Sequence, residues 1–365
     1  MKLNWWQRFV NITLITILVI ATAIFNPIVT SPAQAILAQG DAITDPEAIL
    51  RYALPIDNEY IRKLQTNIEK MSRSMRSKRW KAVAKLVKNA TTVLKLHEED
   101  LIASVPEDFK PRATELVASI KEEVETLPDL VEGQKRSEIY EVRAKILANI
   151  TELEESMVTG FPFEVPEEYA NLPQLLGRAK VLVKTTQGDL TMVVDGFSAP
   201  VTGGNFVDLV DRKFYDGLPF TRAEDFYVIQ TGDPEGKEQG FIDPKTKEYR
   251  AIPLEILVKG ESEPIYGFTT EDVGMYLAQP VLPFNAYGAV ALARPSTDPN
   301  GGSSQFFFFK FDTEVTPPGY NLMDGRFAVF GYVTEGADVL EKLSAEDKMI
   351  SLEVIEGKEN FIPAS

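Results

Sequence analysis

The spacing of apolar residues changes once along this chain, and that change limits what the chain can fold into. From about Pro46 to Met157 apolar side chains recur every three or four residues, whereas after residue 177 they fall into short strand-like runs. The segment between them contains Phe161-Pro162-Phe163-Glu164-Val165-Pro166 and Asn171-Leu172-Pro173, which is too rich in proline for a helix or a central strand. We therefore predict a helical domain at residues 36–158, a proline-rich linker at 159–177 and a β-rich domain at 178–365.

Four stretches of the first domain carry the apolar stripe of an amphipathic helix. The breaks before the third and fourth stretches contain residues that stop helices, namely Pro106, Pro111, Pro128 and Gly133. Short connections favour antiparallel neighbours, so the pattern predicts a helical bundle with the stripes as its core. The stripes are Ile61, Leu64, Ile68, Met71 and Met75; Trp80, Val83, Val87 and Leu94, widened by Leu86 and Val93; Leu116, Ile120, Val124 and Leu127; and Ile139, Val142, Ile146, Ile150, Leu153 and Met157.

The first 35 residues have the composition of an export signal. Lys2 and Arg8 form a basic end, residues 9–25 are nearly free of charge, and Ala33-Gln34-Ala35 offers small residues for cleavage. We predict a mature chain that starts at Ile36. An uncleaved membrane anchor is the alternative, because about 17 apolar residues are at the lower limit for spanning a bilayer. In both cases the working domains lie outside the cytoplasm.

Composition excludes several classes of function. A formal net charge of -16 argues against a nucleic-acid-binding face, which needs concentrated basic residues. The chain has no cysteine, and His97 is its single histidine, so thiolate metal sites, zinc sites and a Ser-His-Asp triad are excluded. We expect no metal and no cofactor, and the chemistry must use other groups.

One stretch departs from the acidic composition. The second predicted helix and its approach are basic, which admits two interpretations. A solvated helix face is the simpler one, because charge runs usually serve solubility. The alternative is docking of an acidic partner, including the acidic C-terminal domain of the same chain. The basic residues are Arg73, Arg76, Lys78, Arg79, Lys81, Lys85 and Lys88.

The second domain begins with a predicted β-hairpin. Residues 181–185 and 190–194 have strand composition, and Gln187-Gly188 supplies the turn. A helix is expected at 201–211, followed by several β-rich segments. Among these, residues 306–309 are four consecutive phenylalanines, expected to form a core strand with alternate rings on opposite faces. The order predicts an α+β chain whose second part is a closed antiparallel barrel capped by helices.

Short segments of this domain form a recognisable set. They are residues 181–190, Ala199-Pro200, Asn205-Phe206, residues 214–217, Phe220-Thr221-Arg222, Gln230-Thr231-Gly232-Asp233, Ser304-Gln305-Phe306-Phe307 and residues 324–331. In this order the segments resemble the cyclophilin family of prolyl isomerases. The resemblance covers about half of the chain, and it implies the barrel fold and isomerase activity. Together with the export signal and the helical domain, the chain resembles the thylakoid-lumen cyclophilins of chloroplasts and cyanobacteria, whose helical part is described as similar to a photosystem II extrinsic protein.

The resemblance implies a site that breaks no covalent bond. Rotation about a prolyl peptide bond crosses a barrier of about 18–20 kcal/mol, so the site must bind the twisted amide preferentially. By position in the family motif, Arg222 is the catalytic guanidinium that donates toward the prolyl nitrogen, and Gln230 holds the substrate backbone or orients the arginine. The implied substrate pocket consists of Tyr227, Val228, Ala293, Phe307, Leu322, Met323 and Phe327.

Some pocket positions depart from the family pattern. Leu322 stands where tryptophan is usual and Phe327 where histidine is usual, while Thr221 replaces the histidine before the arginine. The chain between Asp233 and Ala293 is also longer than in compact cyclophilins, and this insertion is expected to border the groove. These departures leave isomerase strength and cyclosporin binding open.

Two classes of function follow. In the first, the protein is a prolyl isomerase that assists the folding of exported or lumenal proteins, with proline-containing peptides as substrates. In the second, it is a weakly active or inactive chaperone for photosystem II assembly and maintenance, with photosystem II subunits or assembly intermediates as partners. In a regulatory variant, the basic helix folds onto the barrel and covers the groove. The thylakoid lumen and the periplasm are both compatible with the export signal.

Overall fold

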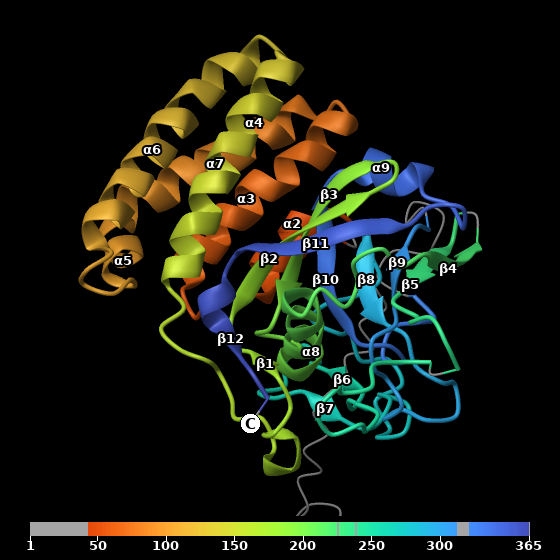
Figure 1. Cartoon of the computed structure of the whole chain (residues 1–365). Coiled ribbons are helices and arrows are strands. Elements are labelled where there is room, and N and C mark those ends of the chain that lie inside the picture. The colour runs from red at the N-terminus through yellow and green to blue at the C-terminus, as the bar shows by residue number, and fades with distance from the viewer. Residues whose placement is uncertain (1–42, 225, 238, 312–320, 365) are drawn as a thin grey trace, which may run out of the picture. The chain divides into compact units, whose positions relative to one another are not determined.

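The computed structural model describes residues 43–364 except 225, 238 and 312–320. The predicted export signal, its cleavage site and the alternative membrane anchor lie outside these residues. The chain forms helices up to residue 156 and mainly strands from residue 174 onward (Figure 1). Within the described part, no helix combines the length and the apolar composition that a bilayer span requires.

Six helices make up the first part of the described chain, and the four predicted stretches correspond to four of them. The predicted stripe residues are buried except Trp80, Leu86 and Val142, which are partly buried against the same core. The prediction missed two short helices. The helices are α2 (Pro46–Ala53), α3 (Glu59–Arg76), α4 (Trp80–Leu96), α5 (Glu98–Ala103), α6 (Lys110–Glu132) and α7 (Arg136–Ser156), and the two missed are α2 and α5.

Local sequence explains where these helices begin and end, with one correction. The Asn58 side chain accepts from the backbone N–H groups of Tyr60 and Ile61 and caps α3. Gly133 ends α6, as predicted. Pro128 does not end a helix; it lies inside α6, where it removes the hydrogen bond to the carbonyl of residue 124. Pro111 sits in the first turn of α6, where a missing N–H has no helical partner to lose.

Eight antiparallel strands form the main sheet of the second part. The predicted hairpin, the predicted helix at 201–211 and the phenylalanine strand are confirmed. Two helices accompany this sheet, α8 (Pro200–Asp211) and α9 (Ala337–Lys342). In sheet order the strands are β11 (Met349–Glu356), β2 (Arg178–Thr185), β3 (Gly188–Asp195), β10 (Val329–Glu335), β8 (Ala289–Leu292), β9 (Phe306–Phe309), β5 (Val228–Thr231) and β4 (Phe220–Glu224).

Closure of the predicted barrel is not confirmed. The sheet is curled, and β4 and β11 are its two ends, with no ladder between them in the described residues. The chain does meet where these strands start: the Gly217 N–H donates to the carbonyl of Met349, the first residue of β11, at 2.9 Å, and Pro219 forms an isolated bridge with Lys348. The two end strands therefore approach at one end without forming a continuous pair.

Short elements surround the main sheet. Inside the predicted linker, the 3-10 turn η1 (Glu167–Tyr169) precedes strand β1 (Gln174–Leu175), so the last part of that segment is structured. Strand β1 pairs with β12 (Phe361–Ile362), which follows the 3-10 turn η2 (Lys358–Asn360). In the insertion, β6 (Glu255–Ile256) pairs with β7 (Ile265–Tyr266).

Helix α2 belongs to the predicted helical domain but packs on the sheet. Ile49 and Leu50 share an apolar cluster with Val193 and Tyr332 of strands β3 and β10. The Arg178 guanidinium of β2 donates to the carbonyl of Leu50 and pairs with Glu155 at 3.3 Å. Helix α2, rather than the basic helix of the prediction, therefore makes this contact between the helical part and the β part.

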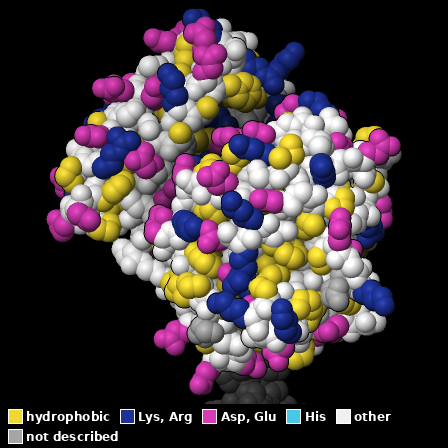
Figure 2. Space-filling model, viewed as in Figure 1, with side chains coloured by type: hydrophobic (Ala, Val, Ile, Leu, Met, Phe, Trp, Pro, Cys, Tyr) yellow, Lys and Arg dark blue, Asp and Glu magenta, His cyan; other side chains and the backbone are white. Residues whose placement is uncertain are grey.

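Surface charge is mixed in sign. Figure 2 shows acidic and basic side chains interspersed on the visible face, with small apolar patches between them. Neither sign of charge gathers in one area of this face. Such a surface favours solubility.

A buried carboxylate from the insertion caps helix α8. Glu255 of β6 accepts from the N–H of Val201 at 3.2 Å and from the N–H of Thr202 at 2.9 Å, at a helix start that has no side-chain cap of its own. Burial disfavours the charged form and raises the pKa of Glu255 to about 7. The insertion therefore supports the sheet domain through a group that titrates near neutrality.

The raised pKa of Glu255 predicts a pH-dependent stability. The folded state binds the Glu255 proton more tightly than the unfolded state, so this group stabilises the fold at low pH and loses that contribution as pH rises from about 4.5 to about 7. In Glu255→Gln the side chain cannot ionise, so its unfolding free energy should not show the fall with rising pH that the Glu255 carboxyl causes. That fall has a slope of at most about 1.4 kcal/mol per pH unit. Urea titrations at pH 5 and pH 8 measure the unfolding free energies of both proteins.

The matched control is Glu261→Gln, an exposed glutamate of the same insertion, which should follow the wild-type pH profile. Parallel stability profiles for the wild type and Glu255→Gln would contradict the assignment.

Candidate functional site

Strand pairing sets four residues of the β part in one row. Arg222 of β4 lies opposite Gln230 of β5, Gln230 lies opposite Phe307 of β9, and Phe307 lies opposite Ala291 of β8. Residues directly opposite each other in an antiparallel sheet project from the same face. The register therefore brings a guanidinium, an amide and an aromatic ring to one side of the sheet.

This row borders a groove of about 650 Å³. All nine residues predicted for the site line it, although they come from segments up to about a hundred positions apart. Their roles remain predictions, whereas their convergence is a property of the structure. The nine are Arg222, Tyr227, Val228, Gln230, Ala293, Phe307, Leu322, Met323 and Phe327.

Aromatic and sulfur-containing side chains form the apolar wall of the groove. Phe307 and Phe327 meet edge to face with ring centroids 5.5 Å apart, and Phe284 stacks on the other side of Phe307 at 6.0 Å. The Tyr227 hydroxyl donates to the Met323 sulfur at 3.3 Å. Leu322, by contrast, is 73% exposed and stands at the rim. The wall is thus packed from behind, and a proline ring could enter from the open side.

A chain of amides holds Gln230. Its Nε2 donates to the Oε1 of Gln305 at 2.7 Å, and the Nε2 of Gln305 donates to the Asp233 carboxylate at 3.0 Å and to the Gln239 carbonyl at 2.9 Å. Because the side-chain N–H of Gln230 donates to Gln305, these hydrogen bonds fix the orientation of the Gln230 amide and of its carbonyl oxygen. Gln305 was not predicted as a site residue, because the sequence gives no signal for a bond across 75 positions.

Arg222 is held loosely. Its Nε donates to Glu224 Oε1 at 2.8 Å, and its Nη2 contacts the same oxygen. The two side chains lie on the same face of β4, two residues apart, and the arginine side chain is 54% exposed. An exposed ion pair of this kind contributes little free energy, so releasing the guanidinium toward a ligand costs little.

Two further arginines line the groove and were not predicted. The Arg294 guanidinium lies 5.3 Å from the centroid of the Phe327 ring and donates from Nε and Nη2 to the carbonyl of Arg326, at 3.0 and 2.7 Å. Partial burial lowers the pKa of Arg294. Arg326 pairs with Glu271 of the insertion at 3.0 Å. Arg294 thus clamps the loop that carries Phe327, which its sequence position after Ala293 does not reveal.

The insertion borders the groove, as expected. Gln239 and Tyr249 both line it. Helix α4 contributes none of the described lining residues, all of which lie between 222 and 327. The structure therefore gives no support to the variant in which the basic helix covers the groove.

A buried acid and a glycine shape the loop at residues 322–327. Asp324 accepts from the Phe284 N–H at 2.8 Å, and burial raises the pKa of Asp324 to about 6. Gly325 has φ +76°, and a Cβ there would lie 2.0 Å from the Thr270 hydroxyl oxygen. Both the backbone conformation and the close approach require glycine.

The groove offers donors and apolar surface but no metal-binding cluster. Within the described ranges, no group of three or more His, Cys, Asp or Glu side chains is placed to hold an ion. What the arrangement can do is bind an extended peptide, bury an apolar ring against Phe307 and direct donors at its backbone. These are the requirements for rotating a prolyl amide.

Comparison with known proteins agrees with this geometry. A model of the cyclophilin type peptidyl-prolyl cis-trans isomerase family matches residues 180–356, and a model described as the PsbQ-like domain of CYP38-like peptidyl-prolyl cis-trans isomerases matches residues 45–158. These two ranges agree with the predicted β-rich and helical domains, whose precise bounds stay predictions.

Three curated relatives extend over most of the chain. A thylakoid lumen peptidyl-prolyl cis-trans isomerase of Synechocystis is 61% identical over 89% of this chain and 86% of its own length. The chloroplastic isomerases CYP38 and CYP37 of Arabidopsis thaliana are 44% and 29% identical, over 93% and 91% of this chain and 80% and 74% of their own lengths. The chain belongs to the family of cyclophilin-type peptidyl-prolyl cis-trans isomerases.

Replacing Gly325 should damage the groove. Gly325→Ala adds a Cβ that collides with Thr270 and strains the backbone, so the 322–327 loop must move and carry Phe327 and Met323 with it. We expect a loss of more than about 1 kcal/mol in unfolding free energy and a clear fall in kcat/KM. Denaturant titration and a peptide isomerisation assay measure the two effects.

Gly274→Ala is the matched control, because Gly274 has φ +81° but no atom within 4 Å of its Cβ position. Gly274→Ala should lose stability only through backbone strain, without a steric clash, and its kcat/KM should equal that of the wild type. Equal effects of the two substitutions would show that the contact with Thr270 is unimportant.

Proposed function

We propose that this chain catalyses rotation about peptide bonds preceding proline, with Arg222 as the catalytic residue. The observation that carries the proposal is the row formed by Arg222, Gln230 and Phe307 along one groove. It places a mobile cation, a fixed amide and an apolar surface side by side. Family membership supports the reaction class, and the geometry supports the assignment of roles.

The proposed mechanism relies on differential binding. As the amide twists, the prolyl nitrogen loses resonance and gains a lone pair, and a guanidinium donor stabilises that state more than the planar one. Arg222 leaves Glu224 at small cost and donates to this nitrogen. Each tenfold acceleration corresponds to about 1.4 kcal/mol of such stabilisation.

Other residues of the groove hold the substrate in this proposal. Phe307 and Phe327 receive the proline ring, and Met323 and Tyr227 close the side of the pocket. Gln230, oriented by Gln305, accepts from the peptide backbone through its side-chain carbonyl oxygen. The chain needs no nucleophile, because no bond is made or broken.

The proposed place of action is the thylakoid lumen. Its support is the 61% identity to a protein named for that compartment, together with the predicted export signal. We further propose that the clients include photosystem II subunits or assembly intermediates, which the match of residues 45–158 to a PsbQ-like domain supports.

A weak or inactive peptide clamp is the second candidate function. It is favoured by the 73% exposure of Leu322, which leaves the rim of the groove open where the family usually has tryptophan. In this reading the groove binds proline-containing segments without accelerating their isomerisation. The same experiment separates the two candidates.

Substitution of Arg222 tests the proposal. In the predicted mature protein, residues 36–365, Arg222→Ala should lower kcat/KM for an alanyl-prolyl peptide by about 100-fold, the lower end of the effect of removing a donor that stabilises the transition state. Peptide affinity should fall much less, because the apolar wall is unchanged. A protease-coupled or NMR exchange assay gives the rate, and calorimetry gives the affinity.

Arg112→Ala is the control, since Arg112 is also an exposed arginine paired with glutamate, but in the helical part. It should leave the rate unchanged. If the wild type binds the peptide without accelerating its isomerisation, the second candidate, a peptide-binding protein without isomerase activity, is correct. If the Arg222→Ala variant keeps its activity, Arg222 is not the catalytic residue.

A further inference from the structure

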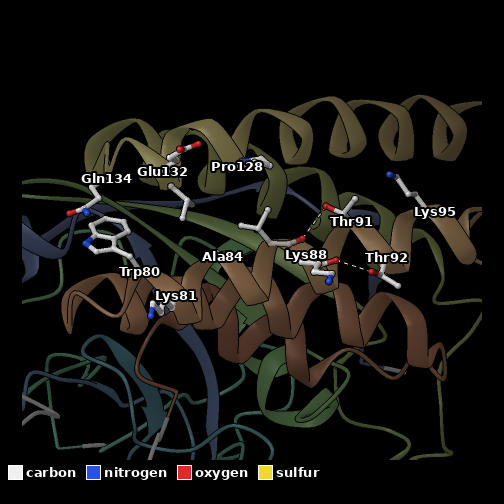
Figure 3. Close-up of a pocket in the computed structure, with 12 residues that line it drawn as sticks. Trp80, Lys81, Ala84, Lys88, Thr91, Thr92, Lys95, Pro128, Glu132 and Gln134 are labelled. Atoms are coloured by element: carbon white, nitrogen blue, oxygen red, sulfur yellow. Dashed lines mark hydrogen bonds between the residues drawn. The ribbon is translucent and has the colours of Figure 1, made fainter.

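A second groove runs along the helical part, far in sequence from the isomerase site. It has a volume of about 640 Å³ and lies on the surface of helix α4, bordered by the end of α6 (Figure 3). Nothing in the isomerase reaction uses it. Its lining therefore needs a separate explanation.

The floor of this groove, here called the α4–α6 groove, is apolar. Trp80, Ala84 and Val87 follow the helical spacing of four and three along α4, and Pro128 and Val131 of α6 face them. Ala84 and Pro128 are exposed although they are apolar. The small side chain at position 84 leaves the hollow open, and the groove has apolar area that none of the described residues covers.

Three lysines stand along this floor at equal intervals. Lys81, Lys88 and Lys95 are seven residues apart, so they recur on one side of α4 about every 10 Å. All three are exposed, and their aliphatic stems extend the apolar surface while the ammonium groups reach solvent. Figure 3 shows Trp80 and Gln134 toward one end of the groove and Lys95 toward the other.

These lysines differ from other lysines of the bundle. Lys63 pairs with Glu59 at 2.6 Å and Lys121 with Glu98 at 2.8 Å. Among the residues that the structure describes, no carboxylate lies within ion-pairing distance of Lys81, Lys88 or Lys95. One acidic side chain, Glu132, lines the Trp80 end of the groove. In a chain of net charge -16, a row of unpaired cations beside an apolar hollow is not explained by internal packing.

We propose that the α4–α6 groove docks an acidic amphipathic helix of a partner protein. Its apolar stripe would cover Trp80, Ala84 and Val87, and carboxylates two turns apart on its flank would face the three lysines. The groove follows α4 from Trp80 to Lys95, a length of about 22 Å, which accommodates a helix of about 15 residues. A helical occupant matches the seven-residue spacing, whereas an extended strand repeats every two residues.

Charge complementarity identifies the occupant's chemistry. Three opposed pairs across a partly apolar groove favour an acidic segment and disfavour a basic one, mainly through association rate and specificity. The attraction should weaken at high salt, because the ammonium groups are exposed. This proposal concerns a surface outside the isomerase groove, so it can fail while the proposed isomerase function stands.

Trp80 provides a direct signal for occupancy. The chain has three tryptophans, and the other two, Trp5 and Trp6, fall within the predicted export signal. The predicted mature protein, residues 36–365, therefore has Trp80 as its single tryptophan, inside the groove. The probe is a synthetic peptide of about 18 residues with leucines at helical spacing and glutamates every seventh residue, itself free of tryptophan.

We expect this peptide to shift the Trp80 emission to shorter wavelength with saturable binding. The same peptide with glutamine in place of glutamate should bind at least tenfold more weakly, and 0.5 M salt should weaken the acidic peptide similarly. The triple variant Lys81→Glu, Lys88→Glu and Lys95→Glu should lose the acidic peptide, while replacement of the same three by arginine should keep it.

The matched control is the triple variant Lys70→Glu, Lys184→Glu and Lys348→Glu, which changes the net charge by the same amount at three exposed lysines outside the groove. It should bind as the wild type does. Equal binding by both charge-reversed variants, or equal binding of the glutamate and glutamine peptides, would overturn the proposal. So would an absent Trp80 response to the peptide, a Trp80 response to anionic vesicles with the same lysine dependence, or a lysine-dependent dimer seen by ultracentrifugation.

Discussion

The antiparallel register of β4, β5 and β9 is the constraint on which the site depends. A shift of one residue in either pairing would turn Arg222, Gln230 or Phe307 to the opposite face of the sheet. In the observed register Phe306 and Phe308 pack in the core of the β part while Phe307 faces the groove. Packing of the core thus positions the reacting groups.

The insertion between β5 and β8 supports that arrangement from outside. Glu255 caps helix α8, and α8 in turn buries Phe206 against Phe306 and Phe330. At the groove, Arg294 holds the backbone of Arg326, whose own side chain pairs with Glu271 of the insertion. A segment that could pass for an unstructured loop therefore anchors both a helix start and the pocket wall.

Sequence predicted the parts governed by local periodicity and by motif. The spacing of apolar residues predicted the four long helices, the hairpin and the phenylalanine strand. The cyclophilin motif pointed to nine site residues, and all nine line the groove. Helices α2 and α5 were missed because six to eight residues are too few for a periodic signal. Pro128 was misjudged because packing of α6 outweighs one lost hydrogen bond. Gln305 and Arg294 act through long-range bonds that no local pattern encodes.

In the proposed mechanism Arg222 and the aromatic wall act on one prolyl bond. A crystal structure of the protein with a bound proline-containing peptide tests it most directly. We predict the proline ring against Phe307 and Phe327, with the Arg222 guanidinium released from Glu224 and within hydrogen-bond reach of the prolyl nitrogen. A peptide bound elsewhere, or one bound in the groove while Arg222 remains on Glu224, would contradict the account.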